Sequence, residues 1–335
     1  MTNIIALNFD KEKTSIIKGF AIIFMILLHV FCGAGWYNKD LPMNHNQELI
    51  SWMGVFKICV GIYTFMVGYG YAFAQRKDFS YSYHHAKKLL IIFWTILLGF
   101  ALPAGYNQLS GGEDLLLNMF SIKSTLCWVS WFVHFYLWAM IVMPFIGRLI
   151  DKKPILFSII FIIGAFLSEV ALHQFIPEYK NNNWLQALFN CLLQTPCMIL
   201  GYLFSRKQWF QRIPIPRHWV VIYIAILITI LTLWMRHKIG SVYGFNMDFF
   251  YAPLVIFCIL AIFNQYGMTF FSRIMAELGD KSVYMWFFHG LFFTAATRGI
   301  YQQIILISDN LWIIAIWTII ITYIGSALIK KAVEY

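Results

Sequence analysis

Long uninterrupted runs of apolar residues constrain this sequence more than any other feature. Each run is about 18 to 24 residues long, the length that an α-helix needs to cross a hydrocarbon layer of about 30 Å. Only 12% of the 335 residues are charged and 60% are apolar, whereas soluble domains carry about 25% charged residues. The composition excludes a soluble globular protein, a disordered chain and a nucleic-acid-binding module. It predicts an all-α polytopic membrane protein.

The sequence predicts ten membrane-spanning helices, joined by short polar loops that often contain Gly, Pro or Asn. No soluble domain, internal repeat or low-complexity tract is visible, so residues 1–335 are expected to form a single integral membrane domain. The first apolar run lacks a small-residue cleavage site, which predicts a retained helix rather than a signal peptide. The expected spans are residues 15–34, 51–74, 86–104, 128–150, 154–174, 184–204, 218–235, 248–266, 281–304 and 309–330.

Basic residues give the expected orientation of these spans. If the N-terminus lies inside, 18 of the 25 Lys and Arg residues fall in the inner segments and five fall in the outer loops. This asymmetry follows the positive-inside rule. It predicts that both termini are cytoplasmic, which requires an even number of spans.

Two ionisable residues are expected on one face of the first span. Lys18 and His29 are eleven residues apart, which leaves them within about 20° of each other around an α-helix and about 16 Å apart along it. The lysine is then expected at the inner surface, with the imidazole above it in the outer half of the membrane. Histidine is suited to proton abstraction near neutral pH, so His29 is the candidate general base.

Three further ionisable residues are expected at the depth of His29, about 9 Å below the outer edge of the membrane. They are Lys57, His134 and Glu169, each from a different span. An ionisable group at bilayer depth costs about 2.5–3.5 kcal/mol for Arg, Lys or Asp, so such groups usually line a functional cavity. We therefore expect a shared polar cavity open to the outside. An ion pair or hydrogen bond that only braces helices is the alternative for each residue.

The ninth expected span contains two more ionisable residues. His289 is expected about 12 Å above the inner edge, where it fits the lower part of the cavity and a hydrogen-bonded core histidine equally well. Arg298 is expected near the outer end, where it either snorkels to the surface or reaches a substrate. The six cysteines lack the spacing of metal ligands, so no metal site is expected.

Four segments, met in order along the chain, resemble the integral membrane acyltransferase 3 family. The residues from Lys18 to His29 are similar to its Arg/Lys-x10-His signature, and Phe65-Met66-Val67-Gly68-Tyr69 is similar to its Phe-x-Ser-Gly-Phe/Tyr segment. The other two segments are Trp131-Phe132-Val133-His134-Phe135-Tyr136 with Pro144, and Leu278-Gly279-Asp280-Lys281-Ser282-Val283-Tyr284 running on to His289. No GxSxG, HExxH, Walker or GxGxxG motif is present, so hydrolase, zinc-protease and nucleotide-motor functions lack support.

The resemblance implies an O-acyltransferase of the bacterial inner membrane. Such an enzyme moves an acyl group, usually acetyl, from cytoplasmic acetyl-CoA to a hydroxyl of a glycan or lipid-linked sugar beyond the membrane. The expected chemistry is general-base catalysis by His29, with a transient acyl-histidine as the second variant. The candidate catalytic residues are His29, Lys18, Glu169, His134 and Lys57.

Binding residues follow from the same interpretation. The coenzyme phosphates are expected on the basic inner surface, and the pantetheine arm is expected to run up the face from Lys18 to His29. Aromatic side chains are expected to stack on the acceptor sugar, although aromatic residues near a span end also form interface belts. The candidate cofactor-binding residues are Lys18, Arg76, Lys87 and Lys88, and the candidate substrate-binding residues are Trp131, Tyr136, His289 and Arg298.

Other function classes remain open at this point. Ten helices with charges at mid-depth also fit a transporter of polysaccharide or small solutes. An O-succinyltransferase of the same fold differs only in the acyl group, and a nonenzymatic scaffold of glycan assembly is a third possibility. Membrane lipids are the other expected partners, nucleic acid is not expected, and the sequence does not indicate an oligomeric state.

Overall fold

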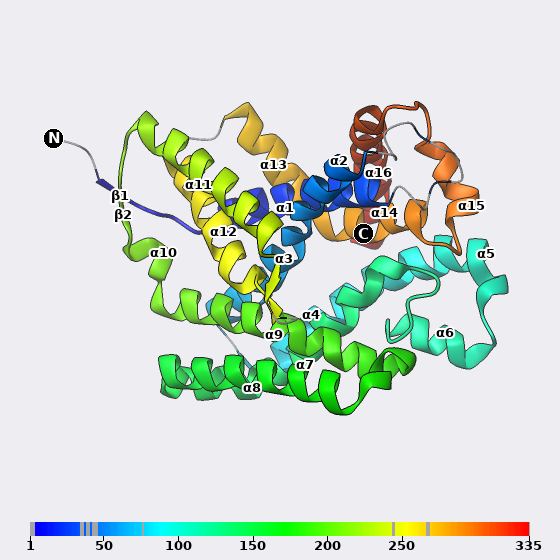
Figure 1. The fold of residues 1–335 in the computed structure, drawn as a ribbon, viewed down its shortest axis with the longest axis horizontal. Helices are drawn as coiled ribbons and strands as arrows, with labels where there is room; N and C mark the ends of the chain where they lie inside the picture. The colour runs from blue at the N-terminus through cyan, green and yellow to red at the C-terminus, as the bar shows by residue number, and fades with distance from the viewer. Residues whose placement is uncertain are drawn as a thin grey trace.

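The computed structural model describes residues 4–33, 37, 41, 46–75, 77–242, 245–265 and 269–334. Within these residues the chain is almost wholly helical (Figure 1), which confirms the predicted all-α class. The sheet found there consists of two short antiparallel pairs. Strand β1 (Ile4–Ala6) pairs with β2 (Pro214–Pro216), and β3 (Ser241–Val242) pairs with β4 (Phe245–Asn246).

Nine helical segments of the described chain are long and apolar enough to cross a membrane. Three of them are built from several joined helices, because short 3-10 or π-helical turns interrupt or extend the regular α-helix. The uninterrupted segments are α1 (Lys11–Cys32), α8 (Pro154–Phe175), α9 (Asn183–Lys207), α11 (Trp219–Lys238), α12 (Asp248–Gln265) and α16 (Leu311–Val333). The first joined segment consists of α2 (Gln47–Met53), η3 (Gly54–Lys57) and α3 (Ile58–Phe73). The second consists of α4 (Phe79–Ile96), η4 (Leu97–Ala101), α5 (Leu102–Gly105) and η5 (Tyr106–Gln108). The third consists of η6 (Trp128–Ser130) and α7 (Trp131–Lys152).

Side-chain caps fix several of these helix starts. The carboxylate of Asp10 accepts a hydrogen bond from the backbone N–H of Lys13 at the start of α1, and Asp78 accepts one from Tyr81 at the start of α4. Such caps satisfy backbone donors that the first helical turn leaves free. The remaining helices are short or lie outside the long apolar segments: α6 (Gly112–Met119), η7 (Pro177–Asn181), α10 (Trp209–Arg212), α13 (Phe270–Asp280), α14 (Ser282–Phe293), α15 (Arg298–Tyr301) and η8 (Gln302–Ile304).

The expected span at residues 281–304 is the exception, and a continuous helix over that range is wrong. Helix α14 has only 12 residues and ends at Phe293, which corresponds to about 18 Å. The hydroxyls of Thr294 and Thr297 donate to the carbonyls of Gly290 and Leu291, both at 2.7 Å. These side chains satisfy backbone acceptors at the end of α14, so the helix can stop inside the protein.

Close glycine contacts bring α13 and α14 against α1. A Cβ atom added to Gly279 would lie 1.7 Å from the carbonyl oxygen of Ser15, and one added to Gly19 would overlap the backbone of α13. Helices α3 and α9 approach each other in the same way at Gly68 and Gly201. Small residues allow such close backbone packing between apolar helices. Since α14 follows α13 directly, the contact at Gly279 sets where α14 lies relative to α1.

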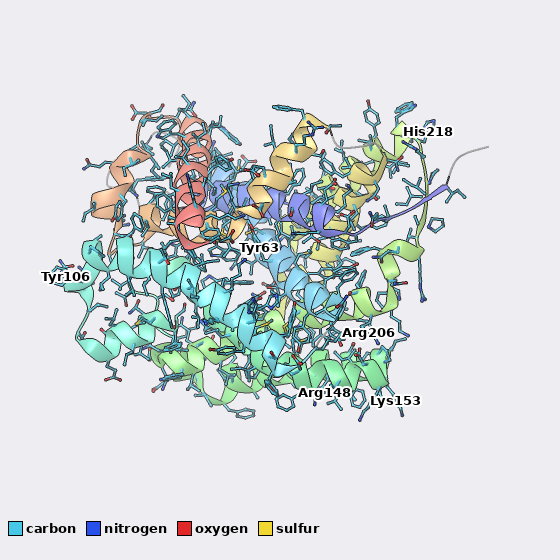
Figure 2. All side chains as sticks on the ribbon, turned by 180° about the vertical axis from the view of Figure 1, so that it is seen from behind. Tyr63, Tyr106, Arg148, Lys153, Arg206 and His218 are labelled. Atoms are coloured by element: carbon cyan, nitrogen blue, oxygen red, sulfur yellow. The ribbon has the colours of Figure 1, made fainter. Side chains whose placement is uncertain are left out.

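Basic side chains from loops expected inside the cell gather at one end of the molecule. Figure 2 shows Arg148, Lys153 and Arg206 near one another, far from Tyr106 in a loop expected outside. The Asp151 carboxylate links this group, because it lies 2.6 Å from Arg206 Nε and 3.4 Å from Lys77 Nζ. These loops are the ones that the positive-inside rule assigns to the cytoplasm.

Candidate functional site

Two histidines from distant parts of the chain meet between α1 and α14. The Nδ1 atom of His29 lies 2.6 Å from the Nε2 atom of His289. The two rings are nearly parallel, with 7° between their planes and 4.9 Å between their centroids. His289 is fully buried and His29 is partly exposed. From the sequence, these residues are expected at different depths, and their pairing is not predicted.

The surrounding hydrogen bonds determine which nitrogen carries each proton. Nδ1 of His289 lies 3.0 Å from the carbonyl oxygen of Met285, one helical turn back. A carbonyl only accepts, so Nδ1 of neutral His289 carries the hydrogen and its Nε2 carries a lone pair. That lone pair accepts the hydrogen bond from Nδ1–H of His29. The Nε2 atom of His29 therefore holds a lone pair and is the basic end of the pair.

The free end of His29 lies among aromatic side chains. The Trp128 ring meets His29 edge to face at 4.8 Å between centroids, and the Phe293 ring lies at 6.3 Å. Among the described residues, none forms a hydrogen bond with Nε2 of His29. Within the described part of the chain this nitrogen is thus left for a substrate, whereas Nδ1 of the ring is held by His289.

A cavity of about 390 Å³ lies on the side of the protein expected to be cytoplasmic, and we call it the inner cavity. Lys18 of α1 and both His85 and Lys88 of α4 contribute its basic groups. Its other described walls are mainly aromatic and aliphatic side chains, among them Met66 and Tyr136. The inner cavity therefore combines cations with an extended apolar surface.

A second cavity of about 710 Å³ lies on the side expected to be extracytoplasmic, and we call it the outer cavity. Its lining is more polar and includes Lys57, Gln194 and Asn190. Two tryptophans, Trp128 and Trp131, also border it. Because Trp128 contacts the ring of His29, this residue connects the outer cavity with the histidine pair.

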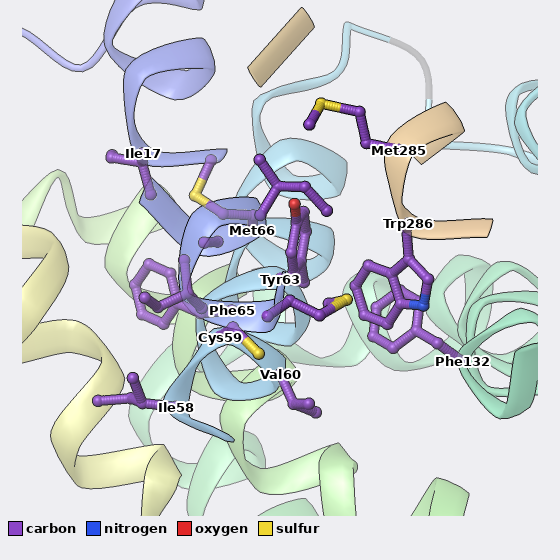
Figure 3. Packing of buried hydrophobic residues seen from close by; sticks show 14 of the residues in the cluster. Ile17, Ile58, Cys59, Val60, Tyr63, Phe65, Met66, Phe132, Met285 and Trp286 are labelled. Atoms are coloured by element: carbon purple, nitrogen blue, oxygen red, sulfur yellow. The ribbon is translucent and has the colours of Figure 1, made fainter. Parts of the chain in front are cut away.

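Three aromatic side chains in the lining of the inner cavity pack against one another, and we call them the aromatic layer. Figure 3 shows its three members, Tyr63, Phe132 and Trp286, which come from three different helices. The Trp286 ring lies 4.6 Å from Phe132 and 4.7 Å from Tyr63. Its Nε1–H donates to the carbonyl of Val129 at 3.0 Å, which fixes the indole. The described linings of the two cavities share no residue. His289 follows Trp286 by three residues, so the pair lies beside this layer.

The predicted cofactor-binding residues divide into three groups. Lys18 and Lys88 line the inner cavity, and Lys88 also lies 3.3 Å from the Glu334 carboxylate. Lys87 is exposed on the same helix and is not among the described lining residues. Arg76 lies outside the described residues. Lys18 lines the inner cavity together with residues of α14, and His29 pairs with His289 of the same helix.

The four ionisable residues expected at one depth do not share one cavity. Lys57 lines the outer cavity, whose lining includes Trp128, a neighbour of His29. His134 instead lines a separate apolar cavity of about 660 Å³, and its Nδ1 lies 2.8 Å from the Ser121 carbonyl oxygen. Glu169 is buried on α8, which packs on α7 and α9.

The predicted substrate-binding residues also separate. Trp131 borders the outer cavity, while Tyr136, one turn further along α7, faces the inner cavity. His289 is the hydrogen-bond partner of His29. Arg298 begins the short helix α15, and the described linings of the two cavities do not include it. The sequence reasoning did not identify Trp128 and Trp286, since tryptophans near a span end are common at membrane interfaces.

Comparison with known proteins gives one match. The acyltransferase domain family matches residues 14–331, which is nearly the whole chain. No curated protein and no solved structure matches it. The matched range contains the His29–His289 pair and all described lining residues of both cavities.

Proposed function

The chain belongs to the acyltransferase domain family, and from that premise we propose that it moves an acetyl group from cytoplasmic acetyl-CoA to a hydroxyl of an extracytoplasmic glycan or lipid-linked sugar. Family membership and the long apolar helices identify a membrane acyltransferase. One observation carries the finer proposal. The His29 ring contacts Trp128 of the outer cavity, and its hydrogen-bond partner His289 follows Trp286 of the inner cavity by three residues. The proposed location is the inner membrane of a bacterium.

The inner cavity has the chemistry that a coenzyme A thioester needs. The donor is a polyanion, so its phosphates are attracted to the ammonium groups of Lys18 and Lys88. Its pantetheine arm is long and thin, and it packs against the apolar walls around Met66 and Tyr136. In this arrangement the thioester end points toward the aromatic layer and the histidine pair.

His29 then acts as the general base. Its Nε2 takes the proton of the acceptor hydroxyl while the hydroxyl oxygen attacks the thioester carbonyl carbon. The tetrahedral intermediate collapses with cleavage of the carbon–sulfur bond, and the departing thiolate receives the proton from His29. His289 is a positioning residue, because its lone pair accepts Nδ1–H of His29 and keeps Nε2 unprotonated at the start of each cycle.

The aromatic layer gives a reason why donor and acceptor enter from different sides. Tyr63, Phe132 and Trp286 are buried in the lining of the inner cavity, and the described linings of the two cavities share no residue. In the proposed cycle, one of these rings rotates before the acetyl group reaches the acceptor. A closed layer also keeps outer water away from the thioester, which suppresses wasteful hydrolysis.

Mass spectrometry of surface glycans tests the proposal. Cells that carry the gene are expected to show an acetyl mass increment that is absent without the gene and absent with His29→Ala. His173→Ala is the matched control, because this histidine is exposed on α8. Both variants should accumulate in the membrane to the level of the unaltered protein. A full acetyl signal with His29→Ala would refute the role of the base.

A transporter is the second candidate, because two cavities facing opposite sides across a closed layer also fit alternating access. It predicts a different result in the same cells. The amount of surface glycan would then fall when the gene is removed, while its acyl content per sugar would stay unchanged.

A further inference from the structure

We infer that the acceptor is an anionic sugar, one that carries a carboxylate or a phosphate, and that the outer cavity binds it through Lys57 and Lys238. This inference rests on the proposed function, because it assigns the chemical class of the acceptor. The observation behind it is an imbalance of charge in the lining of the outer cavity, where two lysines have no described carboxylate partner.

One pair of charges in the outer cavity already cancels. Arg236 lies at the end of α11 and Asp248 lies at the start of α12, and both side chains are buried. Nε of Arg236 donates to one carboxylate oxygen at 2.6 Å, and its second terminal nitrogen donates to the other at 3.0 Å. The remaining nitrogen donates to the carbonyl of Gly54 at 3.1 Å. Each nitrogen of this guanidinium thus has a protein partner, and the guanidinium pairs with the only carboxylate among the described residues of the lining.

The two lysines are the charges that remain. Lys57 and Lys238 line the same cavity, and both side chains are exposed. Within the described part of the chain, neither ammonium group lies within 4.0 Å of a carboxylate. Two unpaired cations in one concave site attract an anion and favour it over a neutral ligand of the same shape.

The rest of the lining fits a sugar ring. Trp128 and Trp131 offer flat apolar surfaces against which the C–H face of a pyranose packs, and Asn190 and Asn246 offer amides for its hydroxyls. The volume of about 710 Å³ lies within the range of small-ligand sites, about 300–1,000 Å³. His237, whose ring stacks on the Trp52 ring with 4.1 Å between the centroids, adds an imidazole to the lining of the outer cavity. The combined chemistry is that of an acidic carbohydrate site.

Binding of three matched probes to the full chain in lipid nanodiscs tests the inference without the donor. The probes are methyl β-glucuronide, glucose 1-phosphate and methyl β-glucoside, followed by ligand-observed NMR titration. At least one anionic probe is expected to bind about tenfold more tightly than the neutral glucoside, and its affinity should fall as salt is added. Preference for the glucuronide indicates a uronic acid, and preference for the phosphate indicates a sugar phosphate.

Variants locate the effect in the outer cavity. Lys57→Gln and Lys238→Gln should each weaken binding of the preferred anionic probe about tenfold and leave the glucoside unchanged, since each removes one charge-assisted contact. Lys180→Gln, an exposed lysine of η7 that is not among the described lining residues, should change nothing. The inference is overturned if the neutral probe binds as tightly as both anions, if no probe binds, or if the two variants behave like Lys180→Gln.

Acetyl-CoA binding to the same samples separates this inference from the proposed function. A chain that binds acetyl-CoA but shows no preference for anionic sugars remains an acetyltransferase with a neutral acceptor. A chain that binds no acetyl-CoA contradicts the proposed function, whatever the sugar titrations give.

Discussion

Replacing His289 is the most informative perturbation, because this residue is proposed to act only through His29. His289→Leu removes the acceptor that lies 2.6 Å from Nδ1 of His29. His289→Gln keeps a carbonyl oxygen at about the same reach, so it still accepts that hydrogen bond. The two variants therefore differ in the one interaction that sets the tautomer of His29.

The expected size of the effect follows from the hydrogen bond. A buried N–H left without its acceptor costs about 1–3 kcal/mol, which corresponds to a factor of about 5 to 160 in the population of the reactive tautomer. His289→Leu should lower kcat by that factor and leave KM for acetyl-CoA unchanged. His289→Gln should recover most of the loss. His29→Ala should lower kcat by about 10² to 10⁴, the usual contribution of a general base.

Membrane vesicles from expressing cells provide the assay, with transfer of labelled acetyl from acetyl-CoA to the endogenous glycan as the readout. The double variant His29→Ala/His289→Leu is the decisive comparison. If His289 acts through His29, the double variant should be no slower than His29→Ala alone. Equal kcat values for the Leu and Gln variants, or additive losses in the double variant, would refute the reasoning.

Three further predictions concern the donor site, the helix contact and an outer loop. Lys88→Gln should raise KM for acetyl-CoA several-fold with little change in kcat, measured in the same vesicles. Lys87→Gln should leave KM unchanged, since Lys87 does not belong to the described lining of the inner cavity. Gly279→Ala should lower the thermal unfolding temperature in detergent by several degrees, because the new Cβ would lie 1.7 Å from the Ser15 carbonyl oxygen; Gly164→Ala, which meets no atom within 4 Å, should not. Hydrogen bonds from Lys123 and the Ser110 backbone hold the pKa of Asp114 below its ordinary value of 3.8. These bonds therefore stabilise the fold fully above pH 3.8, and the stabilisation is lost as the pH falls through the lowered pKa of Asp114. Amide hydrogen exchange should show the protection of the Ser110 N–H fading on acidification, and fading at a higher pH in Lys123→Met.

Apolar length and charge asymmetry were sufficient to predict most of the fold. Nine expected spans are present as long helices, because the apolar runs and their caps are local signals. Most ends lie within four residues of the prediction, but the third segment begins at Phe79, seven residues before the expected start. For the residues around His289 the predicted span was wrong. The apolar sequence continues beyond Phe293, but the hydroxyls of Thr294 and Thr297 end the helix by binding its carbonyls. The length of an apolar run does not show where side-chain hydroxyls compete with backbone N–H groups for the carbonyls of a helix.

The candidate site was predictable only in part. Helical periodicity predicted a common face for Lys18 and His29. In the structure Lys18 lines the inner cavity together with residues of α14, and His29 pairs with His289 of α14. The pairing with His289 depends on how α13 packs against α1 at Gly279, a contact between residues far apart in the chain. His134 and Glu169 were grouped with His29 only because their expected depths in the membrane agree. An expected depth does not indicate how a helix is rotated or which helices are neighbours. The structure places His134 in a separate apolar cavity and Glu169 buried on α8, which packs on α7 and α9.

A cryo-electron-microscopy structure of the full chain with a non-hydrolysable acetyl-CoA analogue tests the central claim most directly. The account predicts that the phosphates lie beside Lys18 and Lys88, that the arm fills the inner cavity, and that the acetyl end reaches the aromatic layer within reach of His29. A donor bound in the outer cavity or beside His134, with its acetyl group remote from His29, would contradict the account.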